Sequence, residues 1–291
     1  NLQNIQILLV EDNQPMMNLI KAVLLSFGVG NIITALNGEE AFKEFCLFNP
    51  DLVITDWMMS PCDGLELSHK IRNDPKSPNK FVPIILMTGF SEKHRVLSAR
   101  DEGITEFMVK PFNSRDLYRR LQKIIESPRQ FVKTVEYFGP DRRRTKAEEY
   151  NGPSRRHTDE QDDKNIAQNA DDVEQAEVCS KYTDYVMFRQ NDVFSVMNST
   201  IHDGLTARVG VGGLADAVLE RAQKLLENHT EDFRPLGEIY LNQMKDGIDY
   251  AIALNKPTNS EDVIARILFP CVQLKANGGM FHYPLITRIA E

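Results

Sequence analysis

The first 127 residues alternate short apolar runs with segments whose apolar residues recur at helical spacing. The runs are rich in Val, Ile and Leu and cover 5–10, 31–35, 51–55, 82–87 and 105–109. Such runs are typical of strands that are buried on both faces of a parallel sheet. A helical pattern follows each run, near 14–27, 38–48, 64–73, 91–102 and 114–125. Because parallel strands need right-handed helical crossovers, the pattern predicts a doubly wound α/β domain of five βα units.

The rest of the chain divides into two parts. Residues 128–165 hold few apolar residues but two similar pieces, Gly139-Pro140 and Gly152-Pro153, each followed by an Arg cluster, and then an acidic run. This composition predicts a charged linker. Residues 166–291 carry several apolar stripes at helical spacing, one of them over 173–200. We therefore expect an all-α bundle of four or five helices, with a kink or interruption at Pro270.

Charge and cysteine content narrow the classes of protein. The net charge of -8 argues against a surface that is wholly devoted to nucleic acid. The four cysteines are scattered without the paired spacing of a zinc site, which fits a reducing compartment. No apolar stretch approaches the ~18 residues of a membrane span, and the chain enters its first strand directly, so we expect no signal peptide and a cytoplasmic location.

Functional groups follow four of the predicted strands at the point where each one ends. These groups are Glu11 with Asp12, Asp56, Thr88 and Lys110. Ligands of open α/β sheets bind at the carboxyl ends of the strands, so we expect the groups to meet there. Crowded carboxylates need a counter-charge, and hard oxygen ligands suit Mg²⁺. The pattern thus predicts a metal-dependent site in which Asp56 is a phosphorylatable nucleophile.

Residues 5–127 resemble the receiver domains of two-component response regulators, the CheY-like family. The resemblance rests on the residues above and on the Met59-x-Pro61-x-Asp63-Gly64 loop and Lys110-Pro111. It implies the flavodoxin-like strand order and a phosphorylated Asp56. It also implies Mg²⁺ bound by Asp12, Asp56 and the backbone carbonyl of Met58, with Glu11 acting through water. Thr88 and Lys110 would contact the phosphoryl group, and Phe107 would occupy the position of the family's switch aromatic.

A second resemblance covers only residues 274–281, Leu-Lys-Ala-Asn-Gly-Gly-Met-Phe, which are similar to the core of histidine phosphotransfer domains. The phosphoacceptor histidine of those domains would fall at Val272, and valine has no nucleophilic atom. The helical half would then be a phosphotransfer-like domain that lacks its histidine.

Three functional hypotheses follow. In the first, a response regulator without enzymatic activity of its own is phosphorylated by a histidine kinase or phosphotransfer protein. It then switches contacts with an unidentified output protein or within a homodimer. In the second, a transcription or RNA regulator binds through the Gly-Pro-x-Arg-Arg pieces. The neighbouring acidic run and the lack of aromatic residues in the Arg clusters argue against it. The third, a phosphorelay intermediate, conflicts with Val272.

Overall fold

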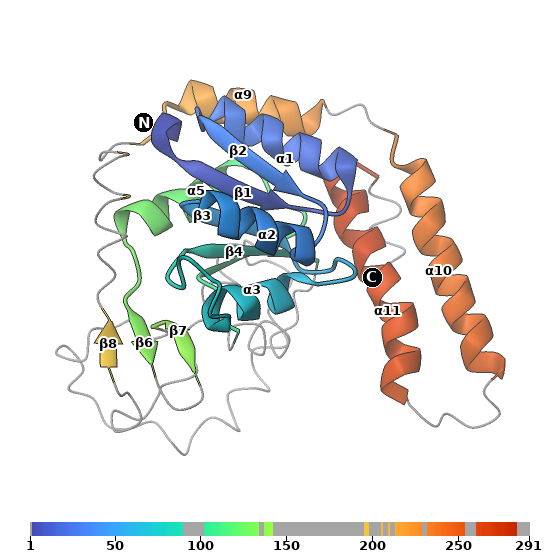
Figure 1. Ribbon diagram of the computed structural model, residues 1–291. Helices are drawn as coiled ribbons and strands as arrows, with labels where there is room; N and C mark the ends of the chain where they lie inside the picture. The colour runs from blue at the N-terminus through green and yellow to red at the C-terminus, as the bar shows by residue number, and fades with distance from the viewer. Residues whose placement is uncertain are drawn as a thin grey trace, which may run out of the picture.

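The first half of the chain folds as a five-stranded parallel sheet with helices on both faces (Figure 1). The computed structural model describes residues 2–89, 102–133, 137–141, 195–197, 205, 209, 213–228, 232–253 and 260–283. The strands lie in the order β2-β1-β3-β4-β5. They are β1 (Gln6–Val10), β2 (Asn31–Ala35), β3 (Leu52–Asp56), β4 (Ile84–Thr88) and β5 (Glu106–Val109). The predicted fold class, strand positions and strand order are confirmed.

Side-chain caps begin the helices where the sequence predicts. The helices are α1 (Gln14–Ser26), α2 (Gly38–Phe48), α3 (Gly64–Asn73) and α5 (Ser114–Glu126), after a short 3-10 turn, η1 (Leu2–Asn4). The side chain of Asn13 accepts a hydrogen bond from the Met16 backbone, and Asp63 and Asn113 each form a reciprocal capping box. These caps satisfy backbone N–H groups that have no partner inside the helix. The helix predicted near 91–102 lies outside the described residues.

The central strands are buried on both faces, as their continuous apolar runs predict. One face of the sheet packs on α1 and α5 through a cluster that includes Leu9, Ile54 and Met87. The other packs on α2 and α3 through a cluster that includes Val10 and Leu86. Strands that are covered on both faces have no solvent side, so their sequences need no polar alternation.

Part of the predicted linker is instead folded against the sheet domain. Strands β6 (Phe131–Lys133), β7 (Phe138–Pro140) and β8 (Ser195–Met197) form a small antiparallel sheet in the order β7-β6-β8. Phe131 is fully buried and packs against Phe81, with ring centroids 5.1 Å apart. The apolar residues of β6 and β7 thus pack on a surface of the first domain, which the composition of the segment does not reveal.

Two further expectations are corrected by this small sheet. Gly139-Pro140, the first of the two Gly-Pro pieces, lies in β7, where both residues are buried, rather than in an exposed linker. Residues 195–197 form a strand, although we predicted helix over 173–200. Both Arg clusters and the second Gly-Pro piece lie outside the described residues.

From residue 213 onward the described part of the chain is helical, as predicted, but the described helices do not form one bundle. They are α9 (Asp216–Glu227), α10 (Arg234–Ala253) and α11 (Ser260–Met280). Helix α9 packs on α1 and α5 through the buried side chains of Leu219, Ala222 and Leu226. Helices α10 and α11 pack on each other as a hairpin beside the carboxyl ends of the sheet strands (Figure 1). Helix α11 continues through Pro270, so the helix is not interrupted there, and a kink at Pro270 stays a prediction.

Candidate functional site

The parallel sheet brings the predicted strand-end groups to one edge. In the strand register, Val10 lies beside Thr55, Asp56 beside Met87, and Thr88 beside Val109. The residues that follow β1 and β5 therefore flank the last residues of β3 and β4. Glu11, Asp56, Thr88 and Lys110 are all buried at this edge. The sequence-based prediction of a shared site agrees with their positions.

Lys110 lies at the centre of the site and joins two acids. Its Nζ lies 2.7 Å from Asp56 Oδ1 and 2.9 Å from Glu11 Oε2, and all three side chains are at most 2% exposed. The Lys110 backbone N–H donates to the Thr88 carbonyl at 2.7 Å, which fixes the start of the loop after β5. A buried lysine stays charged only when it is paired, so the two carboxylates hold this positive charge in place.

The site carries more negative than positive charge. Burial, with the Asp56 charge nearby, raises the pKa of Glu11 to about 8 even though Lys110 acts in the opposite direction. Desolvation and the Asp56 charge raise the pKa of Asp12 to about 6. Burial alone would lower the pKa of Lys110, but the attraction of Asp56 and Glu11 outweighs it and raises that pKa. One lysine does not balance three acids, so a further cation would be stabilised here.

The donor set fits a hard divalent cation. Carboxylate oxygens of Glu11, Asp12 and Asp56 lie within 4.8 Å of one another. The carbonyl oxygen of Met58 lies 3.1 Å from the side-chain nitrogen of Gln273, while the Met58 N–H donates to Asp56 Oδ2 at 3.2 Å. Carboxylate and carbonyl oxygens with room for water are the ligands that Mg²⁺ prefers. The three acids assigned to the metal from sequence are thus close enough together to share one ion.

The loop after β3 must approach the backbone of Asp56 closely. A Cβ atom on residue 64 would collide with the Asp56 carbonyl oxygen, so only glycine fits there. The Gly64 N–H donates to the Trp57 carbonyl at 2.9 Å, and Asp63 caps α3. This packing explains the Asp63-Gly64 pair of the motif by backbone geometry rather than by direct chemistry.

Phe107 lies in the core rather than at the metal site. Its side chain is 3% exposed, on β5 beside Leu86, and belongs to the cluster between the sheet and α2–α3. Val272 of α11 is partly buried against the same cluster. The role of Phe107 as a switch aromatic stays a prediction.

The helical hairpin supplies residues that sequence reasoning did not place at the site. The Gln273 side-chain nitrogen donates to Met58 and lies 3.5 Å from Asp56 Oδ2. Burial, with the Asp12 charge nearby, raises the pKa of Tyr240. Together with Asp12 and Trp57, these residues line a cleft of about 430 Å³. The short likeness over 274–281 adjoins Gln273, but it did not place Gln273 at the site, and a phosphotransfer-like helical half stays a prediction.

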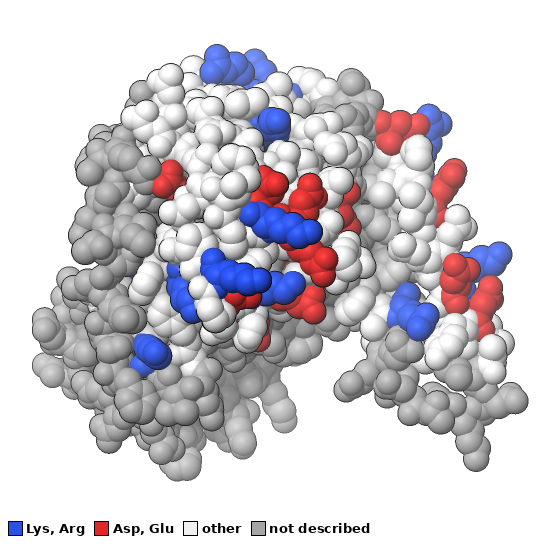
Figure 2. Space-filling model, in the orientation of Figure 1, with Lys and Arg blue, Asp and Glu red and all other residues white. Residues whose placement is uncertain are grey.

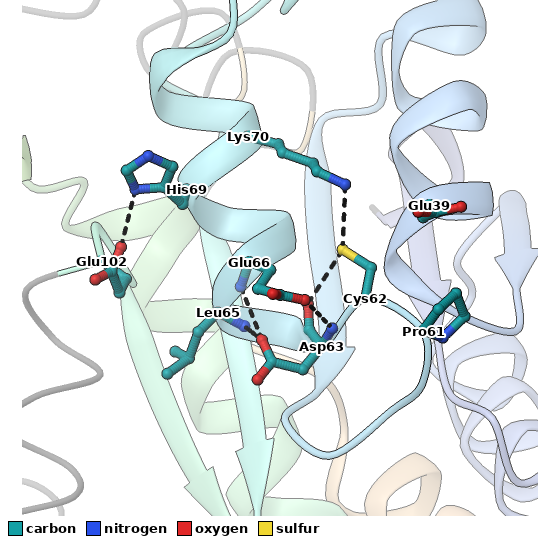
Figure 3. Close-up of a pocket in the computed structure, with 9 residues that line it drawn as sticks. All are labelled: Glu39, Pro61, Cys62, Asp63, Leu65, Glu66, His69, Lys70 and Glu102. Carbon is teal, nitrogen blue, oxygen red and sulfur yellow. Dashed lines mark hydrogen bonds and ion pairs between the residues drawn. The ribbon is translucent and has the colours of Figure 1, made fainter.

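A second cavity, of about 520 Å³, lies between α2 and α3 and is partly lined by the β3–α3 loop (Figure 3). Several of its polar groups are paired with each other: Lys70 Nζ donates to the Cys62 thiol at 3.5 Å, and His69 Nδ1 lies 3.1 Å from Glu102. Acidic and basic side chains are also intermixed over α2 and α3 on the molecular surface (Figure 2). Because positive and negative charges are mixed on this face, it offers a charged ligand no surface of one sign. The acidic cluster around Asp56 remains the candidate site.

Comparisons with known proteins match the chain in two separate segments. The family model described as the response regulator receiver domain matches residues 7–122. A second model, for the Phage SU10 portal protein, matches residues 164–251, of which the structure describes mainly α9 and α10. Among the described residues, none of the helices is both long and apolar enough to cross a membrane.

Curated and solved relatives cover the first segment. Chemotaxis protein CheY-3 of Vibrio cholerae is 31% identical over 124 residues, which is 43% of this chain and 94% of that protein. Chemotaxis protein CheY1 of Helicobacter pylori is 33% identical over 122 residues, 41% of this chain and 96% of that protein.

A solved receiver domain, that of sensor histidine kinase PA1611 from Pseudomonas aeruginosa, has a magnesium ion coordinated in its active-site cleft. It is 28% identical, with a TM-score of 0.39 over 42% of this chain and 98% of that one. The sequence matches to the curated relatives span almost their whole length, and they coincide with the sheet domain and its acidic site. Through this first half, the chain belongs to the CheY-like receiver domains of two-component response regulators.

Proposed function

We propose that Asp56 accepts a phosphoryl group from a histidine kinase or phosphotransfer protein in a Mg²⁺-dependent reaction. The observation that carries the proposal is the buried contact of Lys110 with both Asp56 and Glu11, inside a cluster of three acids that could share one cation. Membership in the receiver family supports the class of reaction and the class of partner.

The positions of the side chains give each a role. A carboxylate oxygen of Asp56 attacks phosphorus, the bond from phosphorus to the donor's imidazole nitrogen breaks, and the electron pair returns to that nitrogen. Lys110 neutralises charge on the incoming phosphoryl oxygens, and Thr88, at the end of β4, offers its hydroxyl to one of them. Asp12, Asp56 and the Met58 carbonyl would hold Mg²⁺, with Glu11 acting through water. Bound Mg²⁺ would supply the remaining positive charge.

The consequence of phosphorylation is a change in protein contacts. The receiver already contacts α11 beside Asp56, so a new charge on Asp56 acts directly on the packing of the hairpin. Four expectations stay predictions: an output protein, a homodimer, the lack of enzymatic activity and a cytoplasmic location.

Phosphorylation can be tested with an Asp56→Asn variant. Wild-type protein incubated with acetyl phosphate and Mg²⁺ should gain the mass of one phosphoryl group, and chelation of the metal should prevent the gain. Asp51→Asn is a matched control, because Asp51 lies before the other end of β3 and accepts a hydrogen bond from the Gln6 backbone at 2.9 Å. Asp51→Asn should be labelled like wild type and Asp56→Asn should not. Label retained on Asp56→Asn would refute the assignment.

A further inference from the structure

The α10–α11 hairpin covers the edge of the receiver that holds Asp56. Its contacts with the receiver run along α11. Near its middle, Gln273 contacts Met58 and Asp56. One turn on, Ala276 lies so close to the loop after β4 that a Cβ on Gly89 would be 2.8 Å from its side chain. At its end, the Met280 sulfur accepts a hydrogen bond from the Phe112 N–H at 3.3 Å.

Gln273 occupies a position that a cation would need. Its two neighbours, the Met58 carbonyl and the Asp56 carboxylate, are both acceptors, so only the N–H end of the amide can satisfy them. These acceptors are two of the three groups expected to bind the metal directly. The amide N–H thus supplies partial positive charge where Mg²⁺ would supply full charge.

The docked hairpin also limits the approach to Asp56. The Asp56 side chain is 2% exposed. A cleft of about 430 Å³ lies beside it, with Asp12, Trp57 and Met58 on the receiver side and Tyr240, Phe269 and Gln273 on the hairpin side. A cleft of this size admits a small molecule such as acetyl phosphate. A histidine on a folded donor must instead reach Asp56 with its whole domain behind it, and α11 stands in that path.

We propose that the hairpin is an autoinhibitory cover of the receiver. A docked hairpin opposes Mg²⁺ binding at the site and phosphorylation of Asp56, and each of these events opposes docking. The inference rests on the proposed function and adds a regulatory residue, Gln273, to it. The coupling is reciprocal: Mg²⁺ bound at the site weakens hairpin docking by the same factor by which docking weakens Mg²⁺ binding. A phosphorylated receiver then releases the hairpin, and a docked hairpin keeps the receiver from a protein donor.

The hairpin is suited to separation from the receiver. The fully buried residues of α10 are two glycines, Gly237 and Gly247, while the apolar side chains of Leu236, Tyr240 and Met244 are only partly buried. It leaves Ile239, Ile248 and Ile252 at least 44% exposed. With few buried apolar side chains on α10, most of the docking energy falls on α11, and a modest change at Gln273 should shift the equilibrium. Release would expose further apolar surface for the output partner.

The test is a Mg²⁺ titration of full-length Gln273→Ala, read by the fluorescence of Trp57. Trp57 is the one tryptophan of the chain, directly follows Asp56 and lines the same cleft. Loss of the amide removes its hydrogen bond to the neutral Met58 carbonyl, so Mg²⁺ should bind about 3- to 10-fold more tightly. Gln243→Ala is the matched control, because Gln243 lines the cleft from α10. Its affinity should equal that of wild type.

Hydrogen–deuterium exchange gives a second readout on the wild-type protein. Mg²⁺ with beryllofluoride, which mimics an aspartyl phosphate, should speed exchange in the last three turns of α11 and leave α9 unchanged. Wild-type affinity in Gln273→Ala, or unchanged exchange in α11, would overturn the inference while the proposed function stands. If no variant binds Mg²⁺ at all, both are overturned.

Discussion

Replacement of Phe131 by alanine tests whether the segment after α5 belongs to the receiver fold. The Phe131 ring is fully buried and lies within 5.7 Å of two other rings, those of Phe81 and Phe138, measured between centroids. The guanidinium of Arg72 lies 5.1 Å from the centre of the same ring. The side chain therefore joins β6 to α3 and to the segment before β4.

The magnitude follows from the size of the cavity. A phenylalanine-to-alanine change in a core costs about 3–5 kcal/mol, and the lost aromatic pairs place this case near the middle of that range. For a domain of this size the melting temperature should fall by roughly 8–16 °C. An exposed linker residue would change the free energy of unfolding by less than about 0.5 kcal/mol.

Thermal unfolding followed by Trp57 fluorescence provides the measurement, because Trp57 reports on the receiver core. Lys133→Ala is the matched control: Lys133 lies on the same strand, β6, with its side chain exposed. The melting temperature of Lys133→Ala should equal that of wild type. Equal melting of Phe131→Ala and wild type would show that the packing of β6 does not stabilise the receiver.

Three further predictions concern buried interactions. Arg72→Met should lower the free energy of unfolding by about 2–4 kcal/mol in denaturant titrations, since Arg72 is the donor to the carbonyls of Gly103 and Lys80; a loss below about 1 kcal/mol would contradict this. Gly279→Val should speed hydrogen exchange in α11, because a Cβ there would lie 2.9 Å from the Pro111 ring. Gly237→Ala is the control, and equal exchange rates of α11 in the two variants would contradict the prediction. Mg²⁺ affinity should rise as the pH increases from about 6 to about 8, because protons leave Asp12 and Glu11 over that range and compete less with the metal. An Mg²⁺ affinity that does not change with pH would contradict this prediction.

The arrangement of Lys110 shows why the site could be predicted from sequence. Each functional residue ends or follows a buried strand, and parallel strands place their carboxyl ends at one edge whatever the details of packing. Pairing with both Asp56 and Glu11 then follows from burial, because a lysine and two acids in a dry environment must contact one another.

The sheet formed by β6, β7 and β8 shows what could not be predicted. Phe131 and Phe138 stand in a short apolar stretch beside an Arg cluster, and local composition there is typical of a linker. Its partners, Phe81 and Arg72, are some 50 residues away in sequence. A contact of this kind depends on which surface the rest of the fold leaves open, and no local pattern records it.

The same distinction applies to the receiver and to the helices that pack on it. The sequence alone determined the receiver, its five βα units and the acidic site, because these depend on local periodicity and on strand ends. Only the tertiary structure decided that α9 completes the receiver core and that α11 lies over Asp56 with Gln273 at the metal ligands. An amphipathic helix records in its sequence that one face must be buried, but not which surface will bury it.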